Sequence, residues 1–277
     1  MDVGALTGVR LVHDPASPVL VGVVHLAPLP GSPRGHLTIE EIIDVAVRDA
    51  VAYQDGGAHA VIIENFGDVP FLKDQVEPHT VAAMTLAIRE VRSVVSIPAG
   101  INVLRNDALA AVGVAALTGA PFIRVNVHTG VTVADQGIIE GRADRTLRYR
   151  KQLGADVAIW ADILVKHGVP LGSQMIEDAA SDAVHRGLAD AVIVTGQATG
   201  KAPDPADLAR VRAVLPTTPV YVGSGVTPET VASYFPAASG IIVGTWAKVD
   251  GRIENRVDRE RVRLLAGSMR AAAGKMT

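Results

Sequence analysis

The sequence predicts a single (β/α)8 barrel, and three observations support this prediction. The chain has 277 residues, a usual length for one such barrel. Short apolar, β-branched runs recur eight times along it, and stretches with a helical period of apolar residues separate them. Strands that alternate with helices indicate βαβ units and a parallel sheet. A doubly wound open sheet is the competing architecture, but eight units in this length favour the closed barrel.

The predicted strands are rich in β-branched and small apolar residues. Hydrophobic residues make up 48% of the chain and aromatic residues only 4%, so Val, Ile, Leu and Ala must build the core. This composition suits strands that helices cover. The strands begin near Leu20, Ala60, Ile97, Phe122, Val157, Ala191, Val220 and Ile241. No linker divides the chain, so we expect residues 1–277 to form one domain, with residues 1–18 as an extension that the pattern does not place.

The first predicted helix has the clearest amphipathic pattern. Its apolar residues from Ile39 to Ala50 fall on one stripe, and its charged residues fall elsewhere. Thr38 and Glu41 have the spacing of a capping box, which predicts that the helix begins after Thr38. This pattern predicts a helix that packs one face on the barrel.

Later helices are marked by an N-cap residue followed by proline at the first helical position. This signal occurs at Asp204-Pro205 and at Thr227-Pro228. The last helix is expected from about Val257 to Ala271. Two tracts interrupt the regular spacing, and we interpret 27–35 and 128–141 as loops, the second a long loop after the fourth strand.

Composition excludes several classes of function. The formal net charge is −3 and the pI is about 6.2, whereas a nucleic-acid binder is expected to have a basic footprint. The chain has no cysteine, so disulfides, thiol catalysis and cysteine-based zinc sites are excluded. The first residues lack a signal pattern and the apolar runs are too short to span a bilayer. We therefore expect a cytoplasmic protein.

Polar side chains gather where the first five strands end, which is where a barrel of this kind places its catalytic groups. In the fourth strand, Arg124, Asn126 and His128 alternate with apolar residues and so share one face, which we expect to point into the barrel. Burying three such groups without partners costs several kcal/mol, which favours a polar pocket at the barrel mouth. The strand-end residues are His25, Glu64, Asn65, Asn102, Arg105, Arg124, Asn126, His128, Asp162, Lys166 and His167.

Each of these residues also has a structural interpretation. His25 can be a core histidine, and Asn65 and Asn102 can be turn or capping residues. Arg124 can pair with a neighbouring carboxylate rather than contact a ligand, and Lys166 can end its strand at the surface. The sequence alone leaves these alternatives open.

The strongest local signal comes after the last two strands. Gly223, Ser224 and Gly225 follow the seventh strand and let the backbone approach a ligand closely, with N–H groups directed at it. Gly244 and Thr245 follow the eighth strand. Loops in these two places bind phosphate in many barrels, so the sequence predicts an anion site there. The alternative is that these glycines only make tight turns.

Two neighbouring segments bear on this anion site. Thr227-Pro228 is expected to open a helix whose N-terminus favours an anion. The loop after the sixth strand, TGQATGKAPD, superficially resembles a nucleotide-binding loop. Its two glycines, Gly196 and Gly200, are too close together, and alanine follows the lysine where Ser or Thr is required. We therefore reject a nucleoside triphosphate site.

Several long motifs occur in a fixed order between about Val19 and Val262. They are GVVHLAPLPGSPR, VIIENFGDVPF, GINVLRNDALAA, FIRVNVHTG, DQGIIEGRA, ADILVKH, GLADAVIVTG, YVGSGVTPE and IIVGTWAKVDGR. Together they resemble the BtpA family, which includes the SgcQ-like proteins. The resemblance implies a TIM barrel. It also implies a link to photosystem I biogenesis in cyanobacteria and to sugar-metabolism genes elsewhere, but no defined reaction.

Two hypotheses follow. The first is an enzyme of isomerase or lyase type that acts on a small phosphorylated metabolite, such as a sugar phosphate or a phosphoribosyl compound. We expect catalysis from Glu64, Asp162, Lys166 and His128. We expect substrate binding from His25, Asn65, Asn102, Arg124, Asn126, Gly223, Ser224, Gly225, Gly244 and Thr245. The second hypothesis is a non-catalytic assembly or stability factor, as the family name suggests.

Two further expectations concern ligands and partners. A divalent metal is an alternative in the enzyme hypothesis, because His25, Glu64, His128 and Asp162 are suitable ligand types from separate strands. The segment 67–76 carries Phe71 and an adjacent leucine, which need cover. Either a lid or a subunit contact supplies it, so a homo-oligomer stays an open alternative.

Overall fold

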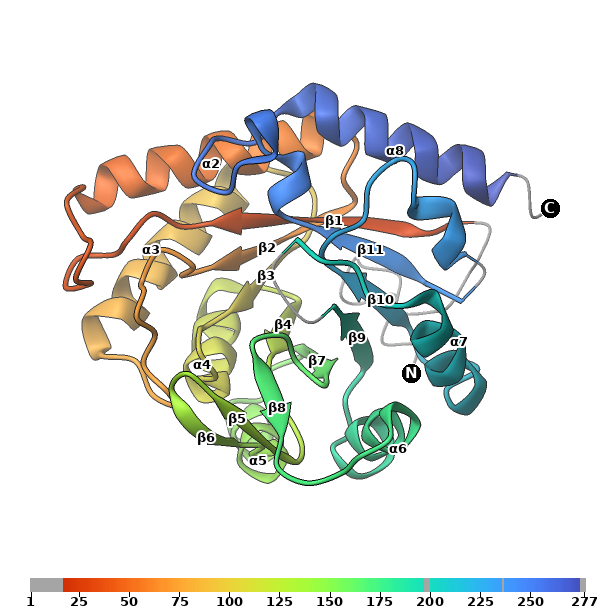
Figure 1. Cartoon of the computed structure of the whole chain (residues 1–277). Coiled ribbons are helices and arrows are strands. Elements are labelled where there is room, and N and C mark those ends of the chain that lie inside the picture. Colours follow the sequence, from red (N-terminus) through yellow and green to blue (C-terminus); the bar gives the residue numbers. More distant parts are fainter. Residues whose placement is uncertain (1–16, 197–199, 236, 275–277) are drawn as a thin grey trace.

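Eight parallel strands close into a barrel in the computed structural model, which describes residues 17–196, 200–235 and 237–274. Figure 1 shows the strands enclosed by a ring of helices. The predicted fold class is thus confirmed. Around the barrel the strands are β1 (Val19–His25), β11 (Gly240–Val243), β10 (Val220–Gly223), β9 (Ala191–Thr195), β7 (Ala158–Ile163), β4 (Phe122–Val125), β3 (Ala99–Asn102) and β2 (Ala60–Glu64).

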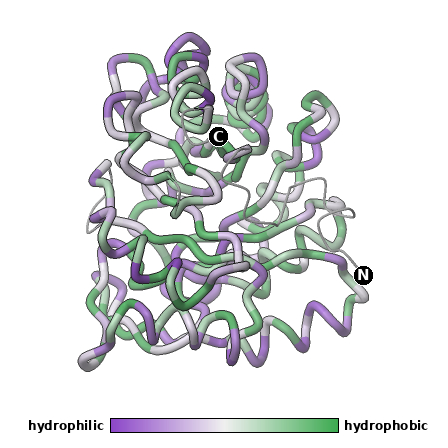
Figure 2. Tube along the Cα trace, turned by 90° about the vertical axis from the view of Figure 1, so that its right-hand side faces the viewer, coloured by the Kyte–Doolittle hydropathy of each residue, from purple (hydrophilic) through white to green (hydrophobic). Residues whose placement is uncertain are grey.

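Helices follow the strands and cover the outside of the barrel. Figure 2 shows hydrophilic and hydrophobic residues alternating along their turns, as expected for helices with one buried face. The α-helices are α2 (Ile39–Asp55), α3 (Pro78–Val94), α4 (Ala108–Thr118), α5 (Ala143–Gln152), α6 (Ile176–Ser181), α7 (Pro205–Val214) and α8 (Arg259–Ala273). A π-helical turn, η1 (Asp182–Arg186), extends α6, and short 3₁₀ helices lie at η2 (Val231–Tyr234), η3 (Thr245–Ala247) and η4 (Val249–Gly251).

Helix starts follow the capping signals in most places. Thr38 and Glu41 form the predicted capping box at α2, and Asp204 caps α7 with proline in its first turn. Helix α8 begins two residues later than expected, because Asp258 is its N-cap and accepts from the N–H of Glu260 at 2.9 Å. These local hydrogen bonds fix where each helix begins.

Two predicted connections differ from the structure. Thr227-Pro228 does not open an α-helix, since a turn and the short 3₁₀ helix η2 follow it. The segment 128–141 is not an irregular loop, since it forms a hairpin of β5 (Val131–Ala134) and β6 (Gly137–Glu140). This hairpin joins β8 (Gly168–Pro170) in an antiparallel sheet with the order β6-β5-β8. The prediction failed because these strands are largely exposed and lack the continuous apolar run that marked the barrel strands.

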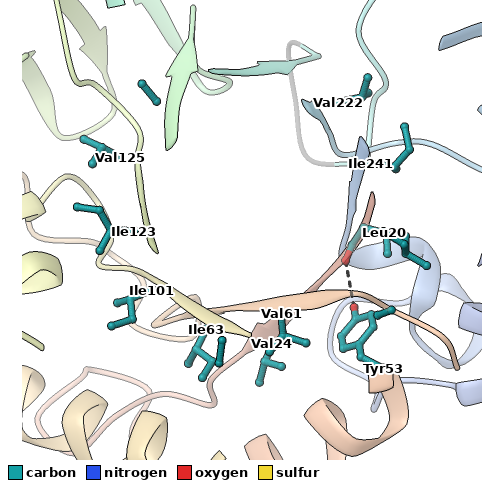
Figure 3. Close-up of a cluster of buried hydrophobic side chains, with 14 of the residues drawn as sticks. Leu20, Val24, Tyr53, Val61, Ile63, Ile101, Ile123, Val125, Val222 and Ile241 are labelled. Atoms are coloured by element: carbon teal, nitrogen blue, oxygen red, sulfur yellow. Dashed lines mark hydrogen bonds between the residues drawn. The ribbon is translucent and has the colours of Figure 1, made fainter. Parts of the chain in front are cut away.

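The main apolar core lies between the strands and the helices. Side chains on the outward face of the strands, such as Leu20, Val61, Ile101 and Ile241, are fully buried against the helices. Figure 3 shows these side chains directed away from the barrel axis. Burial of such side chains contributes about 1.5–3 kcal/mol each, and this layer therefore supplies most of the stability of the fold.

A second apolar cluster fills the lower half of the barrel interior. Its centre is a stack of three aromatic rings, with 4.1 Å between the centroids of Phe122 and Trp160 and 4.3 Å between those of Trp160 and Tyr221. Gly100 faces this stack, where a Cβ atom would overlap the ring of Phe122. We call this cluster the barrel floor, because it closes the interior below the polar residues described next.

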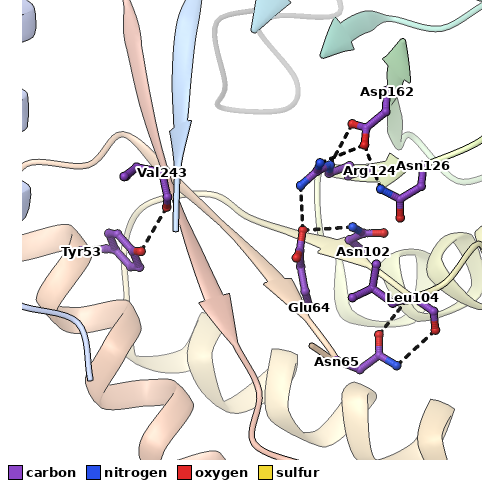
Figure 4. A network of polar contacts seen from close by, with 9 residues as sticks. All are labelled: Tyr53, Glu64, Asn65, Asn102, Leu104, Arg124, Asn126, Asp162 and Val243. Atoms are coloured by element: carbon purple, nitrogen blue, oxygen red, sulfur yellow. Dashed lines mark hydrogen bonds and ion pairs between the residues drawn. The ribbon is translucent and has the colours of Figure 1, made fainter. Parts of the chain in front are cut away.

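Contacts between the two ends of the chain close the ring. Strand β1 pairs with β11, and the Tyr53 hydroxyl donates to the carbonyl of Val243 at 3.1 Å (Figure 4). Lys248 forms a buried ion pair with Asp49, with 2.6 Å between Nζ and Oδ2. These contacts join the first helical unit to the segment after the last strand.

Among the described residues, no helix combines the length and apolar character that a bilayer crossing requires.

Candidate functional site

A polar network lies directly above the barrel floor, on the inward faces of β2, β3, β4 and β7 (Figure 4). Arg124 is at its centre and donates to both oxygens of Asp162 at 2.9 Å. The same guanidinium donates to Oε1 of Glu64 at 3.0 Å, and Asn102 donates to that oxygen at 3.0 Å. Asn126 donates to Asp162 at 2.9 Å. Four strands thus hold one arginine between two carboxylates.

The charges of this network stabilise one another. Burial alone would lower the pKa of Arg124, but the carboxylates of Asp162 and Glu64 outweigh burial and raise it. The paired Nε and NH2 donors to Asp162 have the bidentate geometry in which arginine recognises a carboxylate. The guanidinium is therefore charged, and the two carboxylates hold it in position.

The two carboxylates of the network have different surroundings. Asp162 has no exposed side-chain surface, and Arg124 and Asn126 occupy its oxygens. Asp162 therefore positions Arg124, and its predicted acid/base role has no access to a ligand. Glu64 borders the cavity, and its Oε2 atom makes no hydrogen bond within the described part of the chain. Glu64 is the carboxylate that a ligand can reach.

A cavity of about 540 Å³ opens above the network at the carboxyl ends of the strands. A volume of this size suits a small metabolite. Polar residues from β1 to β7 line one part of its wall, and the glycine-rich turns after β10 and β11 line another. The lining residues are Val23, His25, Glu64, Phe66, Val69, Phe71, Asn102, Leu104, Arg105, Arg124, Asn126, Asp135, Gln136, Lys166, His167, Gly223, Ser224, Ile242, Gly244 and Thr245.

Lys166 is the most reactive group of the cavity wall. Burial and, to a smaller extent, the nearby charge of Arg124 lower its pKa to about 8, against the opposing effects of Glu64 and Asp162. A fraction of this amine is therefore neutral near pH 7 and able to act as a nucleophile or base. His167, next in the chain, lies in the left-handed region with φ 58°. Non-glycine residues in that region cluster at functional sites.

His25 lies beside the glycine-rich rim. Burial, with the cations Lys248, Lys166 and Arg124 nearby, lowers its pKa well below the usual value, so its imidazole is neutral at pH 7. Its ring packs on that of Phe66, with 4.5 Å between the centroids. A neutral imidazole can donate or accept a hydrogen bond without adding charge to the site.

The glycine-rich rim is formed by the turns after β10 and β11. Ser224 has φ 86°, and its hydroxyl accepts from the N–H of Gly200 at 2.9 Å. Gly225 also has a positive φ, and a Cβ atom there would overlap the backbone of Ala202. Gly225 thus shapes the turn from behind, while Gly223, Ser224, Gly244 and Thr245 face the cavity.

Besides Asp162 and Gly225, two further predicted site residues, His128 and Asn65, lie outside the cavity. The Nε2–H of His128 donates to the carbonyl of Gly187 at 2.8 Å, because β4 ends at Val125 and the strand alternation does not extend to residue 128. Asn65 joins the loops after β2 and β3, since its Oδ1 accepts from the N–H of Leu104 at 2.7 Å. The four residues named above as possible metal ligands do not come together in one site. Within the described ranges, no three His, Asp or Glu side chains form a group that could hold a metal ion.

Several cavity residues were not among the predicted site residues. Arg105 lies in the loop after β3, and Asp135 and Gln136 form the tip of the β5–β6 hairpin. Phe66 and Phe71 supply an apolar wall, with 6.3 Å between their ring centroids. Arg105 was visible at a strand end, whereas the hairpin tip became recognisable only once the hairpin itself was known.

The segment 67–76 lies over the cavity. Phe71 lines the cavity, and the carbonyl of Leu72 accepts from the N–H of Arg105 at 3.0 Å. The side chain of Leu72 is 43% exposed. The position of Phe71 agrees with the interpretation of this segment as a lid. The neighbouring side chain of Leu72 is not covered.

The fold and the cavity define the class of protein. It is a TIM barrel with a polar pocket at the carboxyl ends of its strands. Residues 16–271 match the BtpA family, and the chain belongs to that family. The photosystem I biogenesis protein BtpA of Synechocystis is 46% identical over 90% of this chain and 86% of its own length. The putative sgc region protein SgcQ of Escherichia coli is 35% identical over 88% and 91%.

Solved structures with the same fold share little sequence with this chain. A dihydropteroate synthetase matches with a TM-score of 0.59 and 14% identity over 95% of this chain and 96% of that one. N-(5'-phosphoribosyl)anthranilate isomerase from Pyrococcus furiosus matches with a TM-score of 0.55 and 13% identity, over 92% and 99%. At this identity the similarity extends to the fold alone.

Proposed function

We propose that this protein is an enzyme that acts on a small phosphorylated metabolite by acid/base or imine chemistry, as an isomerase or lyase. One observation supports the proposal above all others. A single cavity brings Glu64, a fixed arginine and a lysine with a pKa of about 8 together with the glycine-rich turns after the last two strands. Perturbed titratable groups in a cleft are typical of catalytic sites.

The proposed roles follow from the positions of the groups. The phosphate binds at the rim formed by Gly223, Ser224, Gly244 and Thr245, and this binding energy holds the rest of the substrate over the network. Glu64 transfers a proton through its Oε2 atom, with its other oxygen fixed by Arg124.

Lys166 has two chemically distinct roles available in this proposal. As an ammonium it stabilises an oxyanion that develops on the substrate. As a neutral amine it attacks a carbonyl carbon, and loss of water then gives an imine. The apolar wall of Phe66 and Phe71 limits water at the site, which favours either role.

A thermal-shift titration tests the phosphate rim. Orthophosphate and a panel of sugar phosphates are added to the full chain, and a ligand at about 100 times its Kd adds about 2.7 kcal/mol to the free energy of unfolding. We expect at least one phosphate to raise the melting temperature. The variant Gly244→Val places a branched side chain against His25 and is expected to abolish the shift. No shift with any phosphate would contradict the proposal.

A second candidate function is suggested by the name of the Synechocystis relative, which describes a biogenesis protein. In that case the cavity has no chemical role and a protein partner binds elsewhere. Glu64→Gln discriminates between the two functions, with the exposed Glu90→Gln as its matched control. We expect Glu64→Gln to remain folded and to lose biological activity. Full activity in this variant would favour the assembly role.

A further inference from the structure

Three cations are buried within the described part of the chain, and they differ in their partners. Arg124 pairs with two carboxylates, and Lys248 pairs with Asp49. Arg105 is only 5% exposed and forms no ion pair with a carboxylate of the described residues. A buried charge without a partner is costly, so its presence calls for an explanation.

The contacts of Arg105 hold it in place without neutralising it. Its NH2 atom donates to the carbonyl of Lys166 at 2.8 Å, and its backbone N–H donates to Leu72. Its Nε atom is buried and has no hydrogen-bond partner among the described residues. Burial lowers the pKa of Arg105, against the opposing effects of Asp162, Asp135 and Glu64, which lie beyond ion-pair distance.

Arg105 lies across the barrel mouth from the glycine-rich rim. Arg105 follows β3 and Ser224 follows β10, and both line the same cavity. Three strands separate β3 from β10 in either direction around the barrel. The two strands are therefore diametrically opposite, and Arg105 faces the rim across the mouth.

We propose that Arg105 binds a second anionic group of the ligand, so that the substrate carries a phosphate at one end and a carboxylate or second phosphate at the other. The inference rests on the proposed function for the first of these two groups. Arg105 offers a planar fork of donors that matches either anion. The backbone carbonyl of Lys166 accepts a hydrogen bond from Arg105, and the side chain of Lys166 adds a second positive charge on the same side of the cavity.

Matched ligands test the inference in titration calorimetry on the full chain. Glucitol 6-phosphate and 6-phosphogluconate differ only in a terminal hydroxymethyl or carboxylate, and fructose 1,6-bisphosphate supplies the two-phosphate case. We expect the wild type to bind 6-phosphogluconate or fructose 1,6-bisphosphate, each with two anionic groups, about tenfold more tightly than glucitol 6-phosphate, as one charge-assisted hydrogen bond allows. This comparison needs no variant.

The variant Arg105→Gln, with the exposed Arg148→Gln as control, assigns the preference to the residue. We expect Arg105→Gln to lose the preference and to keep its affinity for orthophosphate. The inference is overturned if the preference survives in Arg105→Gln, or if the wild type binds all three organic phosphates equally. In either case, binding of orthophosphate would still support the phosphate rim. Absence of binding by every phosphate, orthophosphate included, overturns the proposed function and the inference together.

Discussion

The lower and upper halves of the barrel interior are built from the same strands but have opposite chemistry. In β4, Phe122 belongs to the barrel floor and Arg124 to the network, and in β7 Trp160 and Asp162 are divided in the same way. Each pair is two residues apart, the period at which side chains return to the same face of a strand. One step along each strand therefore separates a packed apolar layer from a layer of buried charges.

The comparison shows what each layer needs in order to be stable. The floor is held by ring stacking and by the absence of a side chain at Gly100. The network is held by charge compensation, since each group of its arginine–carboxylate cluster depends on the others. We expect the floor to tolerate apolar changes of similar volume, and the network to lose stability when a charged partner is removed.

Removal of Arg124 should break the upper layer most severely. The variant Arg124→Leu leaves two carboxylates buried without their shared cation, which is expected to cost about 3–5 kcal/mol in the free energy of unfolding. Urea denaturation measures this loss. The control Arg148→Leu removes an exposed ion pair and is expected to cost about 0.5 kcal/mol or less. Similar losses in the free energy of unfolding for the two variants would show that Arg124 does not stabilise the two buried carboxylates.

A methyl group added at one glycine of the floor and at one glycine of the rim sharpens the comparison between the packed and the open part of the barrel. In the floor, Gly100→Ala overlaps the ring of Phe122, and overpacking of this kind costs about 1–3 kcal/mol. At the rim, Gly244→Ala meets Cε1 of His25 at 3.0 Å, where the imidazole can move toward the open cavity. We expect Gly244→Ala to weaken phosphate binding with little loss of stability. The reverse pattern, in melting temperature and ligand titration, would contradict the assignment of the two layers.

We also expect Lys166 to make the stability of the folded protein depend on pH. Its pKa is lowered to about 8 in the folded protein. Between about pH 8 and the ordinary lysine value near 10.4, the unfolded chain binds more protons, so stability rises with pH in this range. We expect Lys166→Met to lose this rise. Competitive acetylation of the wild type should give a midpoint of about 8 for Lys166. A midpoint equal to that of free N-acetyl-lysine amide would show that burial has no effect.

The barrel itself could be predicted from the sequence, because its strands are continuous apolar runs that recur at regular intervals and several of its helices carry capping signals. Strands were expected to begin near Ala60, Phe122 and Ala191, and they begin at those residues. The hairpin at 131–140 was missed because its strands are short and half exposed. A helix was expected after Thr227 because an N-cap residue followed by proline is typical of a helix start. This signal does not extend a helix by itself, and a turn with a short 3₁₀ helix follows it here.

The site could be predicted as a set of strand ends but not as a set of roles. Glu64 and Asp162 look alike in the sequence, and only the position of Arg124 makes one accessible and the other buried. His128 was placed by extending an alternation beyond the end of its strand. Arg105 was seen, but its lack of a carboxylate partner is a property of distances between strands, which no single sequence contains.

The contacts that close the ring also govern how the protein is made. The hydroxyl of Tyr53 binds a carbonyl 190 positions later, and Lys248 pairs with a carboxylate 199 positions earlier. Contacts of such sequence separation form late and slow the folding of a chain. During synthesis on the ribosome, β1 has no partner on one side until β11 has emerged. The nascent chain therefore presents an open strand edge until β11 has been synthesised, and the pairing of β1 with β11 then removes that edge.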